Sequence, residues 1–156
     1  MAIWQFDFYF LPSSFDADCS LDIEKIDVAW HGDIGIRKFV GLCEQECEAA
    51  ESWHDDLRVW KGPGDTDINL WVKKNNIDSI HLRIDLRTDF WPFVELWFDV
   101  ARSLGAKVYC PEAQRVIPPD ERQLSDIVVT SSAGRFVVDP RGFLDSLGEN
   151  GSSGRS

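Results

Sequence analysis

Residues 79–87 alternate apolar and polar side chains more regularly than any other part of this chain. The apolar residues are Ile80, Leu82, Ile84 and Leu86, and the polar residues are Ser79, His81, Arg83, Asp85 and Arg87. Successive side chains of a strand point to opposite faces, so each of these two sets shares one face. One face therefore belongs to a core, and the other faces water or a partner. This pattern predicts a sheet that is covered on one side.

The remaining periodicities predict the order strand, helix, three strands, helix, strand, helix, followed by a last short helix. Strands are expected at residues 2–11, 57–61, 67–73, 77–87 and 107–110, and an irregular connection at 13–34. Helices are expected at residues 36–50, 90–104, 120–133 and 139–147, with Asp89 capping the second and Gly105 ending it. This order predicts an α+β fold, namely a two-layer sandwich with a mostly antiparallel sheet and helices on one face. Residues 1–147 are expected to form a single domain, and residues 148–156 a disordered tail.

Charge narrows the classes of partner. The 156 residues carry a formal net charge of −11, and 44% of them are hydrophobic. The first sixty residues contain thirteen acids and four bases, which gives them a net charge of −9. An acidic surface of this kind disfavours direct binding of nucleic acid. It favours a basic protein partner, although acidity that only maintains solubility explains the charge equally well.

The sequence predicts a cytoplasmic protein. No basic segment precedes the apolar residues at the N-terminus and Asp7 interrupts them, which is not the pattern of a signal peptide. No window approaches ~18 apolar residues without charge, so a membrane span is not expected. Reduced thiols are expected for the four cysteines.

An acidic segment is the first candidate binding surface. From Phe39 to Asp56 there is no Lys or Arg, and six acids occupy the thirteen positions 44–56. Charge crowding of this kind costs stability, which favours a function for it, although a solvated helix face is an equal alternative. The predicted partner-binding residues are Glu44, Glu48, Glu51, Trp53, Asp55, Asp56 and Trp60. The two tryptophans would act as anchors, because Trp is favoured at interfaces.

The polar side of the predicted sheet is the second candidate surface. Its residues are Tyr9, Trp71, His81, Arg83 and Asp85. A histidine beside carboxylates can perform acid–base chemistry, so a small hydrolase or nucleotide-modifying enzyme using Asp7, His81 and Asp85 is an alternative function. The simpler interpretation, which we favour, is that these charges pair across strands.

Two cysteines, Cys43 and Cys47, share one face of the first predicted helix. Together with His31 and His54 they would supply four zinc ligands, but no second closely spaced ligand pair follows them. Their position on the apolar side of the helix predicts core thiols instead. Neither a metal nor a cofactor is therefore expected, and no phosphate loop, dinucleotide fingerprint or nucleophile elbow is present.

Four stretches occur in an order that resembles a group of bacterial proteins. They are Asp27-Val28-Ala29-Trp30, then Ser52-Trp53 with Leu57 and Trp60, then Arg83-Ile84-Asp85-Leu86-Arg87, and finally residues 132–140 with Phe143-Leu144. Over residues 3–147 this order resembles small uncharacterised proteins of the immunity type that accompany polymorphic toxins. The resemblance implies a cytoplasmic antitoxin that neutralises a cognate toxin by stoichiometric binding, and it assigns no functional residue. A regulatory or scaffold module is the other non-catalytic alternative.

Overall fold

The structure is a computed structural model that describes residues 1–13, 33–74 and 76–152. Its strands are β1 (Gln5–Leu11), β2 (Glu48–Ala50), β3 (Leu57–Lys61), β4 (Asp67–Lys73), β5 (Asn76–Asp85), β6 (Lys107–Cys110) and β7 (Arg115–Ile117). Its helices are α1 (Asp33–Glu46), α2 (Trp91–Leu104), α3 (Glu121–Thr130), α4 (Ser132–Val138) and α5 (Pro140–Ser152). The expected connection at 13–34 lies almost entirely outside the described residues.

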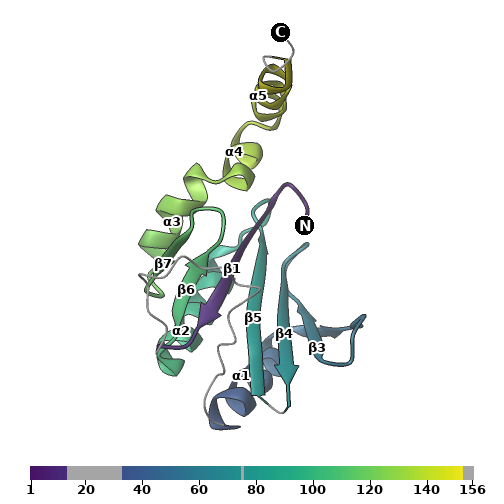
Figure 1. The fold of residues 1–156 in the computed structure, drawn as a ribbon, viewed down its shortest axis with the longest axis vertical. Coiled ribbons are helices and arrows are strands. Elements are labelled where there is room, and N and C mark those ends of the chain that lie inside the picture. Colours follow the sequence, from purple (N-terminus) through teal and green to yellow (C-terminus); the bar gives the residue numbers. More distant parts are fainter. Residues whose placement is uncertain (14–32, 75, 153–156) are drawn as a thin grey trace.

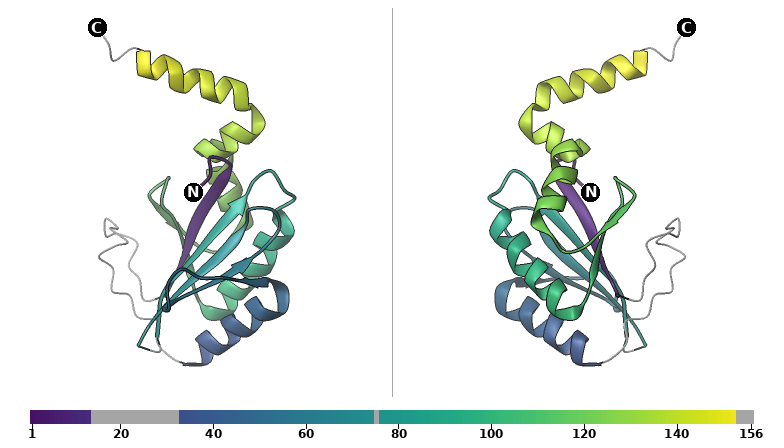
Figure 2. Two further views of the ribbon diagram at one scale, coloured as in Figure 1. Left: turned by 90° about the vertical axis from the view of Figure 1, so that its right-hand side faces the viewer. Right: turned by 90° about the vertical axis from the view of Figure 1, so that its left-hand side faces the viewer.

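All seven strands form one sheet in the order β2-β3-β4-β5-β1-β6-β7. Every neighbouring pair is antiparallel. Helices α1 and α2 lie against one side of the sheet (Figure 2), and α3 adds buried residues to the same core. The prediction of an α+β fold with an antiparallel sheet is confirmed.

The core lies between the sheet and these helices. Alternation along β1, β4 and β5 places every second side chain in it, as the pleat requires. The buried strand residues are Phe6, Phe8, Phe10, Ile68, Leu70, Ile80, Leu82 and Ile84, and they meet Phe39 and Cys43 of α1 and Val94, Trp97 and Phe98 of α2. The opposite side carries the polar residues of the same strands, and we call it the polar face.

Helix α1 ends four residues earlier than predicted. Its last residue is Glu46, and residues 48–50 instead form the edge strand β2, in which Ala49 pairs with Trp60 of β3. The expectation of a helix through Ala50 was therefore wrong. Acidic side chains near a helix C-terminus oppose the helix dipole, and the last turn of α1 has no basic residue to offset them.

The ends of the later helices also differ in detail from the sequence expectations. Phe90, not Asp89, occupies the N-cap position of α2, and no side-chain cap bond is present there. Gly105 ends α2 in the left-handed conformation, as predicted. The helix expected over residues 120–133 is divided at Ser131, whose hydroxyl accepts a hydrogen bond from the backbone N–H of Gly134 and so caps α4.

The C-terminal helices extend away from the sheet. Figure 1 shows α4 beyond the end of the sheet and α5 projecting further from it. Helix α5 continues to Ser152, five residues into the stretch where a disordered tail was expected, and residues 153–156 lie outside the described part of the chain. We call α4 and α5 together the C-terminal arm. None of the described helices has the length and apolar character needed to cross a membrane.

Candidate surface for protein binding

Three aromatic rings form a cluster beside the edge of the sheet. Trp53 and His54 belong to the connection between β2 and β3, and Trp71 lies on the polar face of β4. The Trp53 and Trp71 ring centroids are 5.4 Å apart in an edge-on arrangement, and the His54 ring lies 5.3 Å from Trp71. We call these three residues the Trp53 cluster. Trp53 is nevertheless 78% exposed, so a large apolar surface is held in place and available for contact.

Local hydrogen bonds fix the connection that carries Trp53. The Ser52 hydroxyl donates to the His54 carbonyl at 2.8 Å, and the Asp56 N–H donates to Nδ1 of His54 at 3.0 Å. The Asp56 carbonyl accepts from the Val72 N–H at 2.8 Å, which joins the connection to β4. The His54 ring is thus held by its own connection, and the connection by β4.

Three exposed carboxylates lie close to Trp53 and His54 in the sequence. Glu51, Asp55 and Asp56 belong to the same connection, and we call them the acidic rim. Within the described ranges, none of them forms an ion pair with a lysine, arginine or histidine. Carboxylates without partners repel one another, and a basic partner would relieve that repulsion.

The other predicted partner-binding residues do not all reach this surface. Glu48 is exposed on β2, opposite Lys61 of β3 and next to the connection. Glu44 lies on α1, which packs on the covered side of the sheet. Trp60 is only 3% exposed and belongs to the core, so its assignment as an anchor was wrong. Alternation along β3 turns it away from the polar face.

The second predicted surface meets the first at Trp71. Near the centre of the polar face, the Tyr9 and His81 rings are stacked with centroids 4.3 Å apart, and Nε2 of His81 lies 3.0 Å from a carboxylate oxygen of Asp7. These side chains are brought together because β1 and β5 pair with Tyr9 opposite His81. The two surfaces were predicted as alternatives, because only the strand order shows that β4 joins them.

Charges on the polar face pair across the strands, as the simpler interpretation predicted. Arg83 donates from Nε and Nη2 to the two carboxylate oxygens of Asp67, at 2.8 and 2.5 Å. Lys61 lies 3.7 Å from the same carboxylate, and Asn69 donates to it at 2.6 Å. The hydrogen bond to Asp67 raises the pKa of Arg83. A bidentate pair of this kind holds neighbouring strands in register.

Asp85 performs a structural role at the end of β5. It is 1% exposed and accepts hydrogen bonds from the Arg87 guanidinium and from the backbone N–H groups of Arg87 and Asp65. It therefore anchors the β3–β4 turn. Gly64 in that turn has φ +59°, and a Cβ at this position would lie 2.6 Å from an Asp85 oxygen, so glycine is required there.

The proposed catalytic group of Asp7, His81 and Asp85 is therefore not assembled as one site. Asp7 and His81 are in contact, whereas the carboxylate of Asp85 is occupied by Arg87 and the turn. Four residues along a strand also separate His81 from Asp85 by roughly 13 Å. The assignment of Asp85 to a surface was wrong because outward alternation does not distinguish an exposed carboxylate from one covered by a turn.

Cys43 lies in the core, as predicted, whereas Cys47, which was expected on the same helix face, follows the end of α1. Cys43 and Cys110 are fully buried, and Cys47 is partly buried just after α1. Burial raises the pKa of all three thiols, to about 11 for Cys47 and about 12 for Cys110. Among the described residues, no group of three or more His, Cys, Asp and Glu side chains could hold a metal ion. His31 of the imagined zinc site lies outside the described residues.

We expect the thiols to react slowly and in a fixed order. In a Cys19→Ser background at pH 8, Cys47 should react first with a charged aromatic disulfide, and Cys43 and Cys110 only on unfolding. Raised pKa values leave little thiolate, and burial blocks access to it. The measurement is the time course of the aromatic thiolate that the reagent releases as each cysteine reacts. The control is Cys47→Ser, which should lose the first phase. Rapid modification of all three thiols would contradict this arrangement.

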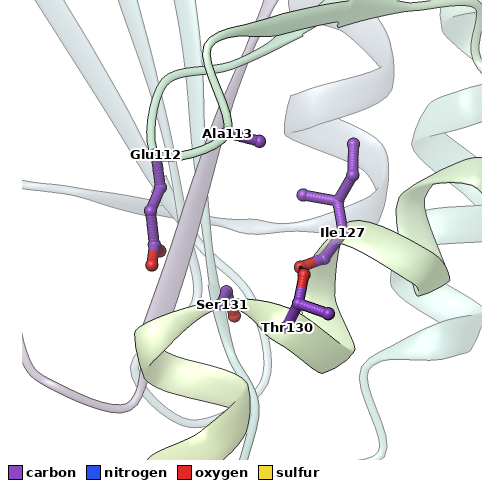
Figure 3. Close-up of a pocket in the computed structure, with 5 residues that line it drawn as sticks. All are labelled: Glu112, Ala113, Ile127, Thr130 and Ser131. Carbon is purple, nitrogen blue, oxygen red and sulfur yellow. Dashed lines mark hydrogen bonds between the residues drawn. The ribbon is translucent and has the colours of Figure 1, made fainter.

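A small polar pocket lies between the β6–β7 turn and the junction of α3 with α4 (Figure 3), and its volume is about 230 Å³. Glu112 at its edge accepts hydrogen bonds from the N–H and the hydroxyl of Ser132, at 2.7 and 2.9 Å. Ser131 donates to the Val128 carbonyl at 2.6 Å. These hydrogen bonds tie the β6–β7 turn to the start of α4 and stabilise the helix junction.

Comparisons with known proteins add no relative. No protein-family model, curated protein or solved structure matches this chain.

Proposed function

We propose that this chain is a non-catalytic, acidic protein-binding domain that acts as an immunity protein. It would neutralise a cognate bacterial toxin in the cytoplasm by stoichiometric binding. The observation that carries the proposal is Trp53, which is 78% exposed, held by the rings of His54 and Trp71, and flanked by the exposed carboxylates of the acidic rim.

This arrangement has the properties of a binding anchor. Trp contributes strongly at interfaces when its position is fixed before binding, because little conformational entropy is lost. The carboxylates around it attract a basic surface and accelerate the encounter. A toxin that acts on nucleic acids or nucleotides needs a basic cleft, and the rim carboxylates would take the place of phosphates in that cleft. The resemblance to immunity proteins favours this class of partner.

The first experiment is co-expression with the product of the neighbouring gene. We expect a one-to-one complex, and we expect this chain to restore growth to cells that the neighbouring product inhibits. A complex without toxicity would favour the regulatory or scaffold alternative. A harmless neighbour that forms no complex would overturn the immunity proposal, and turnover of a substrate by Asp7 and His81 would favour the enzymatic alternative.

Truncation of the anchor should weaken the complex through faster dissociation. We expect Trp53→Ala to cost roughly 2 kcal/mol of binding free energy, which is about 30-fold in Kd. The free energy of unfolding should change little, because the side chain is mostly exposed. Surface plasmon resonance with the neighbouring gene's product measures both rates. Val129→Ala removes another exposed apolar side chain and is the control; an unchanged Kd for Trp53→Ala would place the interface elsewhere.

Neutralisation of the acidic rim should act mainly on association. For the variant with Glu51→Gln, Asp55→Asn and Asp56→Asn, we expect the association rate at low salt to fall roughly 10-fold, with little change in dissociation. The difference should disappear at high salt. Removing the repulsion should leave the free energy of unfolding unchanged or increase it.

The matched control for the rim variant removes the same number of charges from helices α1, α2 and α3. It carries Glu44→Gln, Glu95→Gln and Asp126→Asn, all at exposed positions of α1, α2 and α3. We expect this control to associate at close to the wild-type rate. Equal losses in the two variants would show that total charge steers the partner, rather than the acidic rim.

A further inference from the structure

The C-terminal arm carries three apolar side chains that are half exposed or more. Leu144 and Leu147 of α5 are 52% and 51% exposed, and Val138 of α4 is 87% exposed. Helical spacing places Leu144, Leu147 and Gly148 on one face of α5. A Cβ at Gly148 would meet nothing within 4 Å, so this face is open to close approach by another helix.

Helix α5 has little support from the rest of the chain. It packs on α4, where Phe143 contacts the Phe136 ring with centroids 6.1 Å apart and lies beneath the Arg135 guanidinium. Figures 1 and 2 show it projecting away from the sheet. The helix has thirteen residues, three of which are glycines. Isolated helices shorter than ~12–15 residues are marginal in water, and each glycine costs about 1 kcal/mol relative to alanine. Burial of the face that carries Leu144, Leu147 and Gly148, which we call the leucine face, would stabilise the helix.

Charge indicates what covers this face. Residues 132–152, which span the arm, contain two arginines and three acids, so the arm carries only −1 of the formal net charge of −11. Two copies of this chain repel one another wherever their acidic parts meet. The arm is the part where two copies can approach with the least repulsion. It also projects from the sheet, which keeps the acidic parts of two copies apart, and salt screens charges separated by more than about 8 Å.

We propose that α5 pairs with α5 of a second copy of this chain in an antiparallel, two-fold symmetric dimer. Leu144 of each copy would pack beside Leu147 of the other, and Gly148 would allow the two backbones to approach closely. A two-fold interface uses the same patch on both copies, and a neutral leucine face is complementary to itself. The proposed partner surface around Trp53 lies on the β2–β3 connection and takes no part, so this inference is independent of the proposed function.

Sedimentation of the full chain over a range of concentrations tests the dimer. We expect a reversible shift from the mass of one chain to that of two. The double variant with Leu144→Asp and Leu147→Asp should raise the dimer dissociation constant at least ~100-fold. The control Trp53→Asp places one such charge on an exposed apolar side chain outside the arm and should leave the dimer intact. A wild-type chain that stays monomeric at the highest attainable concentration would overturn the proposal, as would a double variant that dimerises as strongly as wild type.

A second variant separates lost contact from lost helix. Gly148→Gln improves the helix propensity of α5 but fills the space through which the second helix would approach. We expect this variant to weaken the dimer at least ~10-fold while its helical circular dichroism is retained or increased. Dimerisation that strengthens with this substitution would show that the leucine face is not the contact.

Discussion

Replacement of Asp85 by asparagine is expected to lower the free energy of unfolding by roughly 3 kcal/mol. An amide nitrogen would replace one of two oxygens that accept from Arg87, at 2.8 and 2.9 Å, and from the Asp65 N–H at 3.0 Å. The N–H groups of the new amide would then face the N–H donors of Arg87 or Asp65 in a buried position. Urea denaturation at pH 7 measures the loss, and Asp89→Asn, at an exposed carboxylate, is the control that should be nearly neutral.

The same substitution should remove a part of the pH dependence of stability. The Arg87 hydrogen bonds lower the pKa of Asp85 to about 2 in the folded protein. In the unfolded chain the pKa of an aspartate is about 3.9. The contribution is therefore complete above about pH 4 and is lost as the pH falls towards and through 2. We expect the Asp85→Asn variant to show a shallower decline of stability in this range. An unchanged slope would mean that Asp85 is not the group responsible.

Truncation of Trp97 is expected to have the largest effect on stability. This side chain is fully buried between Phe39 and Phe93, with ring centroids 5.4 and 6.0 Å away. Trp97→Ala should cost about 3–5 kcal/mol, because a large cavity remains. Its Nε1 finds no hydrogen-bond acceptor within the described part of the chain. Trp97→Phe should therefore cost much less, since it removes an unsatisfied donor along with some volume.

Thermal and chemical unfolding of the two Trp97 variants provide the test, with Phe98→Leu as a control. Phe98 is also fully buried but has no polar atom in its side chain, so its truncation reports lost volume alone. A Trp97→Phe variant as unstable as Trp97→Ala would show that Nε1 has a partner in the folded protein.

The sequence predicted those elements whose hydrophobic periodicity is long. Strand β5 and helix α2 were predicted close to their observed bounds, because ten and fourteen residues carry enough repeats to distinguish period 2 from period 3.6. The three-residue strands β2 and β7 were not predicted. A strand this short has no detectable period and exists because a neighbouring strand offers hydrogen bonds.

The candidate surface was predicted only in part. Composition singled out Trp53 and the acids around it, which the structure places together in one connection. It could not distinguish Trp53 from Trp60, because burial at Trp60 depends on the register of β3 against β4. Trp53 and Trp71 are eighteen positions apart, and their contact depends on the pairing of β3 with β4. Local sequence carries no record of such pairing.

The interior position of β1 has a consequence for how the chain folds. Among the described strands β1 is synthesised before the others, yet its neighbours are β5 and β6, so that Tyr9 pairs with His81 and with Tyr109. Pairing over such separations requires closure of long loops, and folding slows as contacts become less local. Until β5 leaves the ribosome, Phe6, Phe8 and Phe10 have no strand beside them. The nascent chain thus exposes an aromatic β segment through much of its synthesis, which makes chaperone capture most valuable at that stage.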